Sequence, residues 1–143
     1  EYSKKLINKN MEKNNGAEIP MTLKSLGSKI LEINESNGWG DKKHEVGTNL
    51  MLIVSELSEA MEADRKDKYT EPNAIHDLDL NDDNTFKEVF EKRIKDKFED
   101  EIADTVIRCL DLCVRMNIDI ERHIELKLKY NSTRGYHHGN KKY

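Results

Sequence analysis

Apolar residues recur at steps of three and four along much of this chain, which is the spacing of one face of an α-helix. The first such stripe follows Thr22, a residue type that suits the N-cap. It ends at Asn37 and Gly38, where glycine tolerates the left-handed cap conformation. No stretch of useful length alternates apolar and polar residues as a strand does. The pattern predicts an all-α protein.

Three further helices are predicted, over about 45–66, 85–115 and 119–133. The helix over 85–115 keeps a four-residue apolar step and is either continuous or broken near its start. Asp119 is the expected N-cap of the last helix. We therefore expect a four-to-five-helix bundle.

The second predicted helix is apolar on every side for more than one turn. Its residues 50–54 read Leu-Met-Leu-Ile-Val, so whichever side faces water exposes a large apolar side chain. One small four-helix chain rarely covers a helix all round. We therefore expect a homo-oligomer, in which a second subunit supplies the cover.

The chain is expected to form one domain with polar ends. Residues 1–21 are rich in lysine and asparagine, and we expect a flexible or partly helical lead-in there. The helical domain spans 22–134 and contains a polar insert over 67–86, which is rich in turn-forming residues. Residues 135–143 form a basic C-terminal tail.

Charge and composition exclude several classes of partner. The net charge of −4 and the pI near 5.8 argue against a broad nucleic-acid-binding face. No run approaches the roughly 18 apolar residues of a membrane span, and no signal peptide is recognisable. Cys109 and Cys113 lie one turn apart in an apolar helix, as small buried hydrophobes of a reducing compartment do. These features predict a cytoplasmic protein.

Two pairs of acids are the main candidates for chemistry: Glu56 with Glu59, and Glu101 with Asp104. A spacing of three places both carboxylates of a pair on one helix face, about 5–6 Å apart, where like charges repel. A divalent cation between them offsets the repulsion, because Mg²⁺ prefers carboxylate oxygens. Helical phase instead favours solvated surfaces, since both pairs lie away from the apolar stripes of their helices. Spacing alone leaves both interpretations open.

Other residues have the chemistry to bind a phosphorylated ligand. Trp39, the only tryptophan, lies in a loop beside two glycines, either as a lid over the bundle end or as a surface for a base. Lys127 and Asn131 share one face of the last predicted helix, and Arg134 lies one turn beyond Asn131. A di-iron bundle, a zinc site and a glycine-rich phosphate loop are not indicated, because the chain lacks their residue patterns.

Over about residues 22–140 the chain resembles the MazG-like, all-α nucleoside triphosphate pyrophosphohydrolases. The resemblance is carried, in chain order, by Trp39, Glu56-x-x-Glu59, Glu101-x-x-Asp104 and Lys127-x-x-x-Asn131-x-x-Arg134. It implies Mg²⁺-dependent hydrolysis of a standard or modified NTP or dNTP to a nucleoside monophosphate and pyrophosphate, with Mn²⁺ as a substitute metal. It also implies a homodimer or homotetramer with a shared helical core.

The same resemblance implies roles for single residues. The metal ligands would be Glu56, Glu59, Glu101 and Asp104, with Glu56 and Glu59 also catalytic. Lys127 and Asn131 would contact phosphate or sugar, Arg134 the leaving pyrophosphate, and Trp39 the base.

Two departures from the family pattern open alternatives. Many members carry a glutamate, a possible general base, where this chain has Ser55, so that role falls to Glu56, to Glu59 or to no residue. The gap between the acid pairs is also longer than usual, because of the insert over 67–86. Two alternatives are therefore open. The chain is either a nucleotide-binding or regulatory relative without turnover, or a helical interaction domain.

Overall fold

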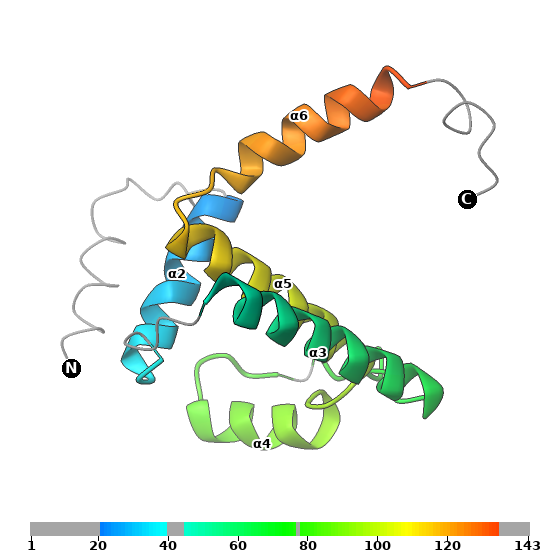
Figure 1. The fold of residues 1–143 in the computed structure, drawn as a ribbon. Helices are drawn as coiled ribbons and strands as arrows, with labels where there is room; N and C mark the ends of the chain where they lie inside the picture. The colour runs from blue at the N-terminus through cyan, green and yellow to red at the C-terminus, as the bar shows by residue number, and fades with distance from the viewer. Residues whose placement is uncertain (1–20, 40–44, 77, 135–143) are drawn as a thin grey trace.

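The structure, a computed structural model, describes residues 21–39, 45–76 and 78–134. Within these ranges the chain forms five α-helices and no strand, which confirms the all-α prediction. The helices are α2 (Leu23–Ser36), α3 (Val46–Arg65), α4 (Asp83–Arg93), α5 (Phe98–Arg115) and α6 (Ile120–Ser132) (Figure 1). None of these helices is long and apolar enough to cross a membrane. The predicted basic tail and all but the last residue of the lead-in lie outside the described residues.

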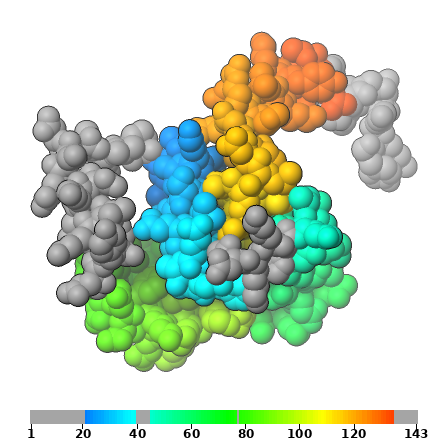
Figure 2. Space-filling model, turned by 60° about the vertical axis from the view of Figure 1, so that its left-hand side comes forward, coloured from blue at the N-terminus to red at the C-terminus, as the bar shows by residue number. Residues whose placement is uncertain are grey.

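Helices α2, α3 and α5 form the packed part of the molecule. α5 lies alongside α3 and is crossed by α2, so it is the central element (Figure 1). α4 lies at one side of this group, and α6 projects from the opposite side (Figure 2). The functional residues that the sequence predicts on α3 and α5 are therefore neighbours.

Local hydrogen bonds fix both ends of α2 where the sequence predicts them. The Thr22 hydroxyl accepts a hydrogen bond from the Ser25 backbone N–H at 3.1 Å, and the Ser25 hydroxyl accepts one from the Thr22 N–H at 3.0 Å. At the other end, Gly38 has a φ of 82°, and the Trp39 N–H donates to the Asn34 carbonyl at 2.9 Å. This closes the last turn and fixes where the chain leaves α2.

The crossing of α2 and α5 depends on a glycine. Gly27 is buried on α2, and a Cβ placed there would lie 2.6 Å from Val114 Cγ2 of α5. Because glycine has no Cβ, the two helices approach closely at this point. Ile30, nearly one turn later, is also buried. On α5, Cys109 and Cys113 are free thiols that are half-buried in the single chain, less than their apolar surroundings predict.

α3 turns a different face to the core than its apolar stripe predicts. Its buried residues are Glu56, Ala60 and Ala63. Large apolar residues of the stripe are about half exposed: Val46, Leu50, Val54, Leu57 and Met61. Helical phase favours a solvated surface for both acid pairs. This interpretation is wrong for Glu56, and for Glu101 on α5, because both are buried. The physical reason is that the most buried positions of α3 hold two small residues, Ala60 and Ala63, which leave room for a carboxylate.

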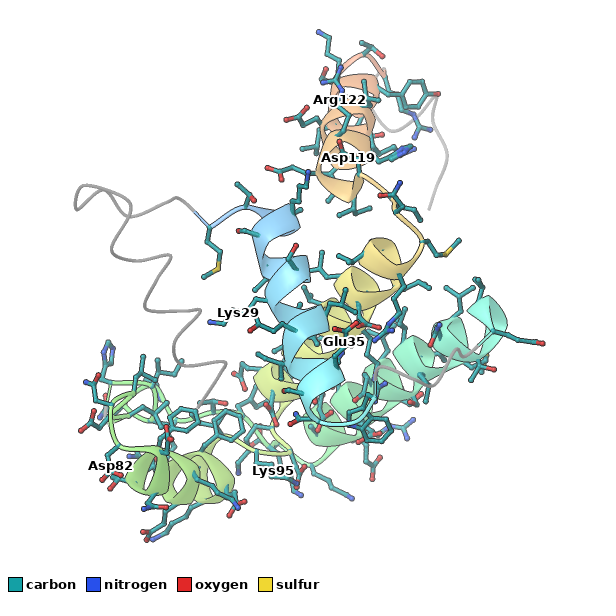
Figure 3. The ribbon with its side chains drawn as sticks, turned by 90° about the vertical axis from the view of Figure 1, so that its left-hand side faces the viewer. Lys29, Glu35, Asp82, Lys95, Asp119 and Arg122 are labelled. Carbon is teal, nitrogen blue, oxygen red and sulfur yellow. The ribbon has the colours of Figure 1, made fainter. Side chains whose placement is uncertain are left out.

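The third predicted helix is broken over residues 94–97, between α4 and α5. In this break Asp96 adopts a left-handed backbone with a φ of 59°. α4 begins at Asp83, so the last residues of the predicted polar insert are helical. Figure 3 labels Asp82, which caps α4, and Lys95, which lies in the turn after it.

The segment that connects α3 to α5, residues 66–97, is called the excursion here. Two hydrogen bonds join its beginning to the start of α5. The Phe98 N–H donates to the Lys68 carbonyl at 3.0 Å, and the Thr70 N–H donates to Glu99 Oε2 at 2.8 Å. The rings of Tyr69 and Phe98 also lie against each other, with centroids 5.4 Å apart. The first turn of α5 is thereby fixed to the chain that leaves α3.

α6 begins where the sequence predicts it. The Asp119 side chain accepts a hydrogen bond from the Arg122 N–H at 3.1 Å, at the foot of the helix (Figure 3). α6 contacts α2 and then extends away from the packed helices (Figures 1 and 2). Large side chains along it are exposed: Ile124, Leu126, Leu128 and Tyr130.

Replacing Gly27 by alanine is expected to destabilise the fold by about 1–3 kcal/mol, because the new methyl group must displace the stiff Val114 side chain. Gly47→Ala on α3 is the matched control. Nothing lies within 4 Å of a Cβ at that position, and alanine favours a helix by up to about 1 kcal/mol. Urea unfolding followed by circular dichroism measures both. Equal free energies of unfolding for G27A and the wild type would contradict the close α2–α5 contact.

Candidate metal centre and adjoining groove

Three carboxylates from two helices converge where α3 and α5 pack together. Glu56 comes from α3, Glu101 and Asp104 come from α5, and one oxygen of each lies within 4.8 Å of the others. Glu56 and Glu101 are also the charged residues that are buried in the described part of the chain. Because charged side chains are rarely buried without a partner, this arrangement requires compensating charge.

Burial and repulsion together raise the pKa of Glu101 to about 7. Loss of water around the carboxylate is the largest cause, and the negative charges of neighbouring acids add to it: Glu59, Asp100, Glu56 and Asp104. The pKa of Asp104 is raised as well, by burial first, although the charge of Arg108 opposes the shift. Near neutral pH Glu101 is therefore only partly ionised, and a bound cation would favour its ionised form.

Arg108 supplies part of the compensating charge. Its Nε donates to Glu56 Oε1 at 2.5 Å, which joins α5 to α3 across their contact. Arg108 lies four residues after Asp104, on the same face of α5. The ion pair balances Glu56, but the pKa values of Glu101 and Asp104 are still raised, so these two carboxylates lack sufficient positive charge.

Glu59, the fourth predicted metal ligand, lies beside this set of three and not within it. It is exposed on α3, and together with Glu101 it lines a shallow depression of about 170 Å³. Among the acids, its charge makes the largest contribution to the raised pKa of Glu101. The structure thus brings three of the four predicted ligands together and places the fourth next to them at the surface.

A second group of acids, Asp96, Asp100 and Glu101, shares Glu101 with the first. Its aspartates already have partners in the turn before α5. Asp96 pairs with Lys95 at 2.8 Å, and Asp100 Oδ2 accepts a hydrogen bond from the Asp96 N–H at 3.0 Å. Both aspartates are also more exposed than Glu56, so the first group, in which two of three carboxylates are buried, is the better cation site.

The donor atoms of the first group fit a hard divalent cation. They are carboxylate oxygens, which suit Mg²⁺ and Mn²⁺ better than zinc. Two oxygens on opposite sides of Mg²⁺ lie about 4.2 Å apart, since each bond is about 2.1 Å long. The spread of up to 4.8 Å exceeds this by an amount that small side-chain rotations can close.

A groove extends from the carboxylates toward the ends of α2 and α3. Its nearer part has a volume of about 300 Å³, and its walls include Asp104, Arg108 and Trp39. A larger part of about 750 Å³ shares Trp39 and Arg108 and continues to Arg115 at the end of α5. Trp39 is 57% exposed, and its backbone is held by the cap of α2. The predicted base-binding residue therefore lies on the same groove as one of the predicted metal ligands.

Charged residues follow one face of α5 along this groove. After the two acids, the stripe continues at steps of four, three and four: Glu101, Asp104, Arg108, Asp111 and Arg115. This is the spacing of a single helix face. The face of α5 that holds the carboxylates is therefore polar over most of its length.

α2 contributes one hydrogen bond to the polar stripe. Asp111 accepts a hydrogen bond from Asn34 Nδ2 at 3.0 Å and another from Arg115 Nε at 2.7 Å. Glu35, labelled in Figure 3, lies at the same end of α2 and lines the larger part of the groove. The lining of the groove thus includes three polar side chains that are joined by hydrogen bonds, Asn34, Asp111 and Arg115.

The remaining predicted site residues lie on or just after α6. Lys127, Asn131 and Arg134 are exposed there, and α6 leaves from the end of α5 opposite to the acids (Figure 1). Lys127 Nζ and the Arg134 guanidinium lie 5.2 and 5.7 Å from the centre of the Tyr130 ring. Within one chain, the structure does not bring these residues to the carboxylates.

Sequence reasoning missed Arg108, Asp111 and Asn34. The signal for the first two is the alternating step of four and three after Asp104, which keeps them on its helix face. Asn34 leaves no such signal, because its contact with Asp111 depends on how α2 crosses α5.

Comparison of the chain with protein families, with curated proteins and with solved structures finds no match. The MazG-like resemblance stays a prediction that rests on the residues themselves.

In the protein without metal, the raised pKa of Glu101 is expected to make stability fall as pH rises. The folded state retains this proton up to about pH 7, whereas the unfolded chain releases it near the ordinary value of 4.5. The stabilisation is therefore complete below 4.5 and is lost as pH rises through about 7. Because Glu101→Gln removes this dependence, the variant should gain most over the wild type above pH 7.

Thermal unfolding in EDTA, between about pH 4.5 and 8, measures this effect. Glu32→Gln, at an exposed position of α2, is the control and should reproduce the wild-type profile. If the advantage of E101Q did not grow with pH, the Glu101 carboxylate would not be buried among acids as described.

Proposed function

We propose that this protein is a nucleoside triphosphate pyrophosphohydrolase that requires Mg²⁺, or Mn²⁺ as a substitute, as its MazG-like residue pattern implies. The observation that carries the proposal is that two buried carboxylates, Glu56 and Glu101, converge with the more exposed Asp104 where α3 meets α5, and that Arg108 compensates their repulsion only in part. A helical interaction domain with incidental surface acids does not account for this burial, because an unpaired carboxylate loses free energy on leaving water.

The adjoining groove supports a nucleotide as the ligand. It connects one of the clustered carboxylates, Asp104, with Trp39, so an aromatic ring on which a base can stack shares a groove with one side of the proposed phosphate site. Standard and modified NTPs and dNTPs all meet this requirement, because each combines a base with a triphosphate.

In the proposed reaction, Glu56, Glu101 and Asp104 would hold a divalent cation. When bound, it would supply positive charge against the phosphates and would make a nearby water more acidic. A water oxygen attacks the α-phosphorus, and the bond from that phosphorus to the bridging oxygen breaks. Pyrophosphate leaves with the bridging oxygen, and a nucleoside monophosphate remains. The contribution of the protein is mainly positioning and charge neutralisation, as in other phosphoryl-type transfers.

Glu59 is the favoured acceptor for the proton of the attacking water. It is exposed beside Glu101, whereas Glu56 is buried and paired with Arg108. Ser55, which stands where many family members have a glutamate, donates its hydroxyl to the Leu52 carbonyl at 2.8 Å. The hydroxyl is thus used within α3.

The proposed active unit is a homodimer or homotetramer. Met51 on α3 is 64% exposed, and other large apolar side chains are exposed on α3 and, separately, on α6. A second copy covering these faces would remove a large apolar area from water. We propose that in this assembly the α6 of one copy contributes Lys127, Asn131 and Arg134 to the site of the other, because within one chain these residues lie away from the carboxylates.

A nucleotide-binding protein without turnover is the second candidate. Two observations favour it: Ser55 replaces the glutamate of many family members, and Arg108 already occupies one oxygen of Glu56. It differs from the first candidate in a single measurable respect, since it binds nucleotide and releases no product.

Hydrolysis is tested by measuring pyrophosphate released from a panel of NTPs and dNTPs, with and without Mg²⁺. Glu59→Ala and Asp104→Ala should each reduce the rate by at least about 100-fold and leave the helical circular dichroism spectrum intact. Glu32→Ala, on the exposed side of α2, is the matched control and should keep full activity. Mg²⁺ should raise the melting temperature of the wild type and have less effect on D104A, because a ligand of the folded state stabilises it.

Retained activity in both E59A and D104A would remove the assignment of the acids. Nucleotide binding by calorimetry with no product from any substrate would select the second candidate. A wild type indifferent to Mg²⁺ in both assays would leave only a helical interaction domain.

The assembly is tested by sedimentation velocity. Met51→Asp should dissociate the oligomer, because it places a charge at the centre of the proposed apolar contact. Leu80→Asp, at a 76% exposed position in the insert, makes the same chemical change away from α3 and α6 and should leave the oligomer intact. A monomeric wild type at micromolar concentration would refute the proposed assembly.

A further inference from the structure

Arg108 connects the carboxylate cluster to the groove. Its guanidinium has five N–H donors, and in the described part of the chain its hydrogen bonding is confined to Nε, which donates to Glu56 Oε1. The Arg108 side chain is 42% exposed, whereas that of Glu56 is only 8% exposed. One edge of the guanidinium therefore holds a buried carboxylate, and the rest lies on the wall of the groove.

Glu56 has two competing uses. Its oxygen belongs to the set of three that fits a cation, and the same side chain is the ion-pair partner of Arg108. A guanidinium this close also repels a divalent cation, because like charges a few ångströms apart interact strongly where water is partly excluded. Cation binding and the Arg108–Glu56 pair therefore oppose each other.

A triphosphate removes this conflict. Arginine binds phosphate oxygens through two parallel N–H bonds, and its charge is permanent. Arg108 lines both parts of the groove, next to Asp104 and Trp39. Arg115, the other arginine on the groove, is already paired with Asp111. Arg108 is thus the better placed of the two arginines to meet phosphate beside the carboxylates.

We propose that Arg108 exchanges partners: it neutralises Glu56 in the cation-free protein, and it turns to a phosphate of the bound nucleoside triphosphate when a divalent cation takes the Glu56 carboxylate. This inference rests on the proposed function. It predicts that cation and nucleotide bind cooperatively, because the nucleotide withdraws from Glu56 the positive charge that opposes the cation. By linkage, each ligand then strengthens the binding of the other by the same factor.

The test measures binding without turnover. Mn²⁺ affinity is determined by electron paramagnetic resonance, first alone and then with a non-hydrolysable triphosphate analogue. Analogue affinity is determined by calorimetry at saturating Mn²⁺. Arg108→Gln should bind Mn²⁺ alone about tenfold more tightly than the wild type, since a repelling charge is gone. It should bind the analogue at least about tenfold more weakly, since a charged phosphate contact is lost.

Two further variants make the result specific. Arg108→Lys keeps the charge but not the paired N–H geometry, so it should bind Mn²⁺ as the wild type does and the analogue more weakly. It also carries the test if R108Q does not fold. Arg122→Gln removes the same charge on α6, where Arg122 pairs with Glu125, and should leave both affinities unchanged.

The opposite signs of the two effects distinguish exchange from a structural role. If R108Q weakens both ligands, Arg108 only holds the site together, and the inference is overturned. If R108Q changes neither affinity while the wild type hydrolyses its substrate, the inference fails and the proposed function stands. A wild type that binds no Mn²⁺ at Glu56 refutes both.

Discussion

The loss of hydration at two glutamates determines how this site is built. Where α3 meets α5, Ala60 and Ala63 leave space that Glu56 fills, and Glu101 faces it from the other helix. A carboxylate removed from water requires a cation, a donor or a proton. Arg108 meets that requirement for Glu56, and a pKa raised to about 7 meets it in part for Glu101. A divalent ion would meet it for the whole group, which links the packing of the helices to the proposed chemistry.

The same contact explains the unusual surface of the chain. Because the buried positions of α3 hold small and acidic residues, most of its large apolar residues are left on the outside. α6 extends beyond the packed helices (Figure 2). It presents further exposed apolar residues. The polar contact with α5 and the apolar outer surface of α3 therefore have the same cause, namely which face of α3 packs against α5. A homo-oligomer would reconcile them, by burying the exterior while the interior contact holds the ligands.

Much of the helical order could be predicted from the sequence, because caps are local. Thr22, Gly38 and Asp119 act at the positions that their chemistry indicates. The break at 94–97 and the burial of Glu56 could not be fixed in this way. Both depend on contacts between distant segments, such as Phe98 with Lys68 and Glu56 with Arg108. Periodicity identifies an apolar face but does not reveal which face a neighbouring helix will cover, and a wide stripe such as that of α3 leaves the choice open.

The hydrogen bonds at the base of the excursion between α3 and α5 have a consequence for sequence change. Phe98 to Lys68 and Thr70 to Glu99 join the two ends of this excursion just before the acids of α5. Such a clamp isolates the register of Glu101 from the length of chain beyond it. Changes of length within this excursion are therefore expected to leave the carboxylates of α5 in position, provided that the buried Ala74 is kept.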